Sequence, residues 1–86
     1  MNPYSKLNSM LAFEFQKYLM AHPKISERIA PNTLVIFQIN GDEKFNQWSM
    51  ETALKNREKN QPVVKVHLKK WREKSILKDL EISKAA

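Results

Sequence analysis

Apolar side chains recur at intervals of three and four residues near the start of the chain, the spacing that lines one face of an α-helix. These positions are Leu7, Met10, Leu11, Phe15, Tyr18 and Leu19. Asn2 or Ser5 can cap the helix start, and His22-Pro23 ends it because the residue before a proline is disfavoured in the helical region. The pattern predicts an amphipathic helix, after which Pro23 opens a short extra turn.

A run of β-branched and aromatic residues, TLVIFQI at 33–39, shows no polar alternation. A strand that is apolar on both faces is usually a central strand covered on both sides, and we predict that position for it. Gly41 follows, and Asp42 is placed to cap a second amphipathic helix that ends near Lys59.

After the break at Asn60-Gln61-Pro62 the sequence VVKVHLKKW alternates between apolar and basic residues. Val64, Val66 and Leu68 fall on one face, and Lys65, His67 and Lys69 fall on the other. This period of two predicts a half-buried strand whose basic side chains face solvent.

The order helix, strand, helix, strand predicts a compact single domain of the α/β class over residues 1–74, with α+β as the alternative. Strand, helix, strand is the pattern of a βαβ crossover. Because two strands make a poor sheet, either the C-terminal tail, residues 75–86, adds an element or two chains combine their sheets. We expect a homodimer.

The charge of the chain is concentrated in one block. The formal net charge is +6, and residues 55–74 hold eight basic and two acidic side chains, which accounts for the whole excess. There is no cysteine, and no apolar run is longer than that of Leu34–Phe37, which is far shorter than the roughly 20 residues that cross a bilayer. We therefore expect a cytoplasmic protein that does not bind membranes.

The block includes a cluster of possible contacts for a polyanion, namely Lys65, His67, Lys69, Lys70, Trp71 and Arg72. An aromatic residue among cations is typical of surfaces that stack bases and neutralise phosphates of single-stranded nucleic acid. Two alternatives stay open. In the first, the partner is an acidic protein that contacts exposed apolar residues, namely Phe13, Met20, Ile76, Leu77 and Leu80, while the basic block steers association. In the second, the lysines only keep the strand soluble.

Signatures of catalysis, cofactors and metals are weak. The loop NGDEK at 40–44 follows a strand, where α/β sheets receive ligands, but it holds one glycine and two acidic residues that disfavour a phosphate. His22 and His67 belong to no metal or nucleophile motif. We expect no enzyme activity, no cofactor, no metal and no small-molecule substrate. His22 is expected to end its helix.

The segments EFQKYLMAHP (14–23), TLVIF (33–37) and FNQWSMETALKNREKNQPVVKV (45–66) occur in an order that resembles a small prokaryotic family of unknown function. Its members share a helix ending in His-Pro, a strand, a helix and a Gln-Pro-Val-Val strand. The resemblance covers roughly residues 7–70. It implies the same compact α/β fold and brings no assigned activity.

Overall fold

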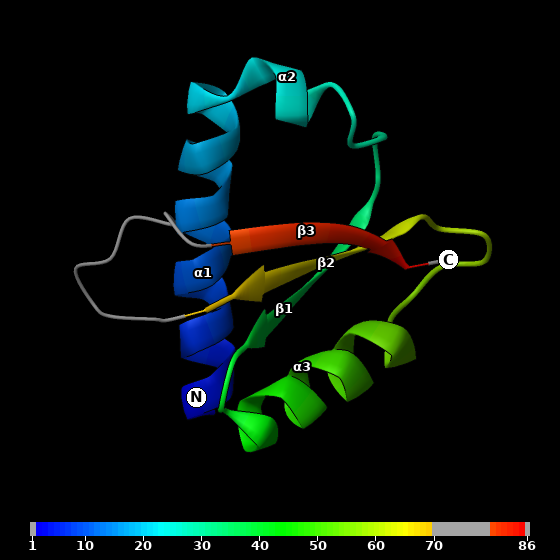
Figure 1. Ribbon diagram of the computed structural model, residues 1–86. Coiled ribbons are helices and arrows are strands. Elements are labelled where there is room, and N and C mark those ends of the chain that lie inside the picture. The colour runs from blue at the N-terminus through cyan, green and yellow to red at the C-terminus, as the bar shows by residue number, and fades with distance from the viewer. Residues whose placement is uncertain (1, 70–79, 86) are drawn as a thin grey trace.

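In the computed structural model, which describes residues 2–69 and 80–85, the chain forms three helices and a three-stranded sheet (Figure 1). The elements in chain order are α1 (Pro3–Ala21), α2 (Pro23–Ser26), β1 (Leu34–Ile39), α3 (Glu43–Lys55), β2 (Val63–Leu68) and β3 (Leu80–Ala85). β2 pairs with β1 in parallel and with β3 in an antiparallel direction. The predicted α/β class and βαβ crossover are confirmed.

The first helix begins and ends where its sequence signals lie. The Asn2 side chain accepts a hydrogen bond from the Tyr4 backbone N–H at 2.7 Å, which satisfies one of the unpaired amides of the first turn. At the other end the His22 N–H donates to the Leu19 carbonyl at 3.1 Å. The His22 ring also stacks on Tyr18 with centroids 4.1 Å apart. Both contacts hold His22 at the C-terminal cap of the helix, as predicted.

The second long helix begins at the predicted cap but ends earlier than predicted. Asp42 accepts from the Phe45 N–H at 3.1 Å, and the preceding Gly41 makes the turn from β1 at φ +88°. The predicted end near Lys59 is wrong, because α3 stops at Lys55. Asn56 then donates its side-chain amide to the Thr52 carbonyl at 2.9 Å, a local bond that competes with continuing the helix.

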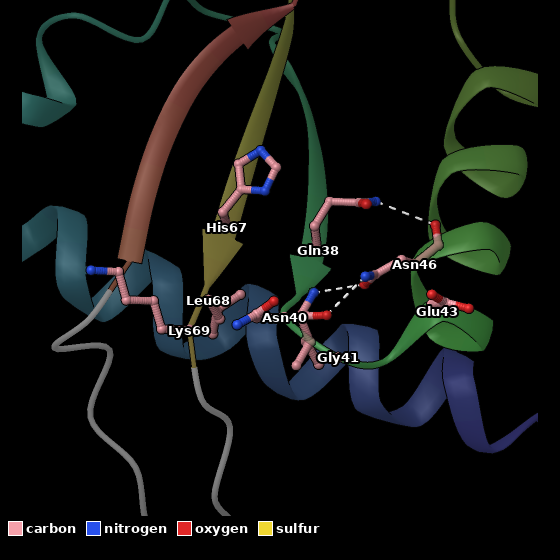
Figure 2. A pocket seen from close by; sticks show the side chains of 9 residues that line it. Gln38, Asn40, Gly41, Glu43, Asn46, His67, Leu68 and Lys69 are labelled. Atoms are coloured by element: carbon pink, nitrogen blue, oxygen red, sulfur yellow. Dashed lines mark hydrogen bonds between the residues drawn. The ribbon is translucent and has the colours of Figure 1, made fainter.

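The segment 33–39 is an edge strand, so its predicted central position is wrong. The sheet order is β1-β2-β3, which makes β2 the central strand. Ile36 and Phe37 point to opposite faces of β1 and are still only 1% and 2% exposed. The apolar pattern is explained by α3, which lies beside the outer side of β1 where a central strand would have a second neighbour (Figure 2).

The third strand comes from the predicted tail. Residues Leu80–Ala85 pair along the whole of β2, with Leu68 opposite Leu80 and Val63 opposite Ala85. Residues 75–79 of the tail lie outside the described residues. One chain therefore supplies three strands, which removes the main reason for expecting two chains to combine their sheets. Dimerisation stays a prediction, which light scattering tests.

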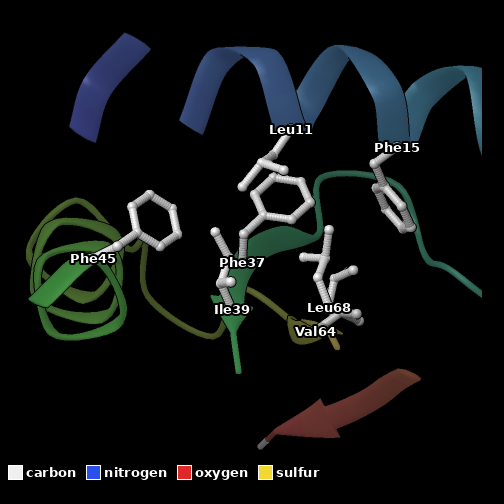
Figure 3. Close-up of a cluster of buried hydrophobic side chains, with 8 residues drawn as sticks. Leu11, Phe15, Phe37, Ile39, Phe45, Val64 and Leu68 are labelled. Atoms are coloured by element: carbon white, nitrogen blue, oxygen red, sulfur yellow. The ribbon is translucent and has the colours of Figure 1, made fainter. Parts of the chain in front are cut away.

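The core lies between α1 and one face of the sheet, with the first turn of α3 closing one end (Figure 3). Its buried members are Leu11, Phe15, Phe37, Ile39, Phe45, Val64, Val66 and Leu68. Phe15 meets Phe37 edge to face at 5.8 Å between ring centroids. Ile82 of β3 packs against this cluster. The core therefore uses the odd-numbered positions of β1 and the even-numbered positions of β2, and the alternate positions point to the other face.

Candidate functional site: a basic strand face and the adjoining pocket

The predicted basic residues of β2 lie on the face of the sheet that points away from α1. Lys65 and His67 alternate with buried Val66 and Leu68 and are half-buried, and Lys69 follows the strand end and is exposed. We call Lys65, His67 and Lys69 the basic strand face. The predicted alternation is confirmed. Because β2 has a neighbouring strand on each side, these basic residues lie in the middle of the sheet and not at its edge.

Three of the six predicted contact residues cannot be placed with the others. Lys70, Trp71 and Arg72 lie outside the described residues and directly follow Lys69 in the sequence. The structure therefore brings together Lys65 and His67 on β2 and Lys69 directly after its end, and it leaves the expected role of Trp71 as a prediction from sequence.

A pocket of about 580 Å³ adjoins this face at the carboxyl ends of the parallel strands β1 and β2 (Figure 2). It is lined by Gln38, Ile39, Asn40, Gly41, Glu43, Asn46, His67, Leu68 and Lys69. The carboxyl end of a strand is where an α/β sheet commonly receives its ligand, and the sequence identified this loop as that position. The pocket joins His67 and Lys69 to this loop and to Gln38 and Asn46, which the sequence pattern did not select.

Asn46 of α3 shapes the pocket wall by bonding to the edge of β1. Its side-chain oxygen accepts from the Ile39 N–H at 2.6 Å, and its amide donates to the Ile39 carbonyl at 2.8 Å. A neighbouring strand would offer Ile39 the same donor and acceptor. One side chain of a helix therefore closes this end of the edge strand, and α3 is held beside the sheet.

Gln38 also bridges β1 and α3. Its side-chain amide donates to the Asn46 carbonyl at 3.3 Å and to the Phe37 carbonyl at 3.2 Å. Sequence reasoning missed Gln38 and Asn46 as site residues. The available signal was a single amide, Gln38, in an otherwise apolar strand, because a half-buried amide needs partners.

The cations of the basic strand face are not neutralised by nearby carboxylates of residues 2–69. Within that range the ion pair found is Glu14 with Lys17, 2.9 Å apart on α1. Among the described residues no three His, Asp or Glu side chains gather as a metal site requires. None of the helices in this described part is both long and apolar enough to cross a membrane.

A mixed sheet with α1 on one face and a row of basic residues on the other defines a small α/β domain with a polar strand surface. The chain belongs to DUF5647, a family of unknown function, whose family model matches residues 3–81. The resemblance to an uncharacterised family is thereby confirmed. Comparison with curated proteins and with solved structures finds no significant match.

Proposed function

We propose that this domain is a binding module rather than an enzyme, and that it holds single-stranded nucleic acid on the basic strand face. The observation that carries the proposal is the alignment of Lys65 and His67 on the central strand with Lys69 directly after its end, away from the core. Alternate residues of a strand are about 6.7 Å apart, so the three positions span about 13 Å. The row is therefore long enough to contact more than one phosphate of an extended single strand.

The local surroundings support binding of a polyanion. Lys65 is half-buried on a rigid central strand, so less side-chain freedom is lost on binding than for a fully exposed lysine. Neither Lys65 nor Lys69 forms an ion pair with a carboxylate of residues 2–69, so their charge is not cancelled within that range. Trp71, which follows two positions after Lys69, supplies the stacking residue in this proposal.

The salt dependence of binding tests the proposal. A short single-stranded RNA of mixed sequence, labelled for fluorescence anisotropy, is expected to bind with an affinity that falls about sevenfold between about 50 and 200 mM salt, since two phosphates neutralised by Lys65 and Lys69 give a slope near −1.4. The variant Lys65→Ala/Lys69→Ala is expected to remove most of that salt dependence, because both lysine contacts are lost.

The matched control is Lys6→Ala/Lys24→Ala, which removes the same charge from exposed positions of α1 and α2. It is expected to keep nearly the full slope. If the wild type shows no salt-sensitive binding at micromolar concentration, or if both double variants lose affinity equally, the basic strand face is not a nucleic acid site.

The alternative partner, an acidic protein, is an outcome of the same assay. Poly-glutamate added as competitor presents carboxylates without bases or phosphates. Displacement of the RNA at equal charge concentration contradicts nucleic acid as the ligand and favours an acidic protein surface. Displacement only at a large excess supports the proposal.

A further inference from the structure

The pocket at the carboxyl ends of β1 and β2 has two sides of different chemistry. His67 and Lys69 line it on the β2 side, while Gln38 of β1 and Glu43 of α3 line it on the other (Figure 2). The Ile39 backbone, held by Asn46, lies between them. A matching ligand has an anion at one end, hydrogen-bond donors at the other and a flat, partly apolar body.

The side formed by β1 and α3 offers acceptors. Gln38 uses its amide N–H groups on the carbonyls of Phe37 and Asn46, so its side-chain oxygen is the polar atom of that amide left for a ligand. Glu43 contributes a carboxylate, which as an anion can only accept hydrogen bonds. Asn40, which also lines the pocket, carries both a donor and an acceptor, so Gln38 and Glu43 supply the acceptor-only part of this side and favour ligand groups that donate.

We infer that this pocket receives one nucleobase that carries an amino group, with guanine preferred, from the strand held on the basic strand face. The inference rests on the proposed function. Guanine presents its ring N–H and its amino group side by side, which matches the two oxygens of the Glu43 carboxylate, whereas uracil has no amino group. The phosphate of the same nucleotide then lies toward Lys69.

The register of the sheet gives the base a platform. His67 and Gln38 are direct partners across β2 and β1, and adjacent strands lie about 4.8 Å apart. Figure 2 shows the two side chains on neighbouring strands at the pocket. An imidazole plane can stack an unpaired base, and Gln38 is then within reach of the edge of that base. The pocket volume of about 580 Å³ is within the usual range for small-ligand sites.

Titration of the full chain with mononucleotides, followed by ¹⁵N NMR, tests the inference. Guanosine monophosphate is expected to shift the amides of Gly41 and Glu43 and to bind about tenfold tighter than uridine monophosphate, since a hydrogen bond to a charged group contributes roughly that factor. Glu43→Gln is expected to reduce this preference to about twofold or less, because the amide replaces one acceptor by a donor.

Glu51→Gln is the matched control. Glu51 is an exposed residue of the same helix that accepts from Gln47 and does not line the pocket, so the guanine preference should be unchanged. Equal binding of both nucleotides, no shift at millimolar nucleotide, or a preference that survives Glu43→Gln overturns the base pocket. If salt-sensitive RNA binding persists although the base pocket is overturned, the proposed nucleic acid binding on the basic strand face remains valid without the pocket. If guanosine monophosphate binds but RNA does not, the proposed nucleic acid binding fails instead.

Discussion

Phe45→Ala is expected to lower the free energy of unfolding by about 3–5 kcal/mol, the usual cost of removing a fully buried phenylalanine. Phe45 is 0% exposed and lies at the start of α3, where it contacts Tyr4 of α1 and Trp48. Its ring therefore joins both long helices to the sheet (Figure 3). Because small domains have only about 5–15 kcal/mol of stability in total, the variant should unfold at much lower urea concentration, as measured by circular dichroism.

Phe13→Ala is the matched control for that experiment. The same aromatic side chain is removed from α1, but Phe13 is 58% exposed and its nearest notable contact is the Lys17 ammonium, 5.0 Å from the ring centroid. An exposed cation–π contact contributes at most about 1 kcal/mol, so the loss should stay below that value. Equal losses in the two variants would mean that Phe45 is not at the centre of the core.

Local sequence signals were sufficient for most elements of the fold. The caps at Asn2 and Asp42 and the stop at His22 depend on residues that are neighbours in the chain; Asp42 and His22 were placed correctly, and the first cap is one of the two candidates, Asn2 and Ser5. The alternation in β2 also depends on one strand alone. These features follow from backbone hydrogen bonding and side-chain direction, which a short window of sequence contains.

The edge position of β1 in the sheet could not be predicted from such local signals. Burial of Ile36 and Phe37 on opposite faces is consistent with a second neighbouring strand or with a helix beside the edge, and the sequence pattern is the same for both. The contact that marks β1 as an edge strand closed by a helix is made by the side chain of Asn46, which lies on α3 seven residues after Ile39. An asparagine on a helix is more commonly exposed, so its identity gave no signal.

The candidate site was likewise predictable from the sequence only in part. Lys65 and His67 lie on one strand and Lys69 directly follows it, so their common face followed from the period of two. Gln38 and Glu43 join them only because α3 is held beside β1 and because β1 pairs in register with β2. Those are long-range contacts, and the pattern of a single sequence does not specify them.

Asn46→Ala is expected to destabilise the fold by about 1–3 kcal/mol, because it removes two hydrogen bonds and leaves the partly buried Ile39 N–H without its partner, while the Ile39 carbonyl keeps the Asp42 N–H at 3.1 Å. Gln47→Ala is the control, since the neighbouring Gln47 is exposed and bonds only to Glu51 among the described residues. That change should cost less than about 0.5 kcal/mol in urea unfolding. Similar costs for the two variants would contradict the edge-closing role of Asn46.

Asn46→Asp separates hydrogen bonding from packing at this edge. The new side chain has nearly the same shape, and one oxygen can still accept from the Ile39 N–H, but an ionised carboxylate places its other oxygen against the Ile39 carbonyl, where Asn46 donates at 2.8 Å. At neutral pH the loss should therefore equal or exceed that of Asn46→Ala. At acid pH the protonated carboxyl can donate to that carbonyl, so the stability difference from wild type should shrink, whereas the alanine variant should show no such recovery. An unpaired edge strand can pair with other chains, so both Asn46 variants should also increase light scattering at high protein concentration. Unchanged scattering together with wild-type stability would show that other contacts of α3 close the edge of β1.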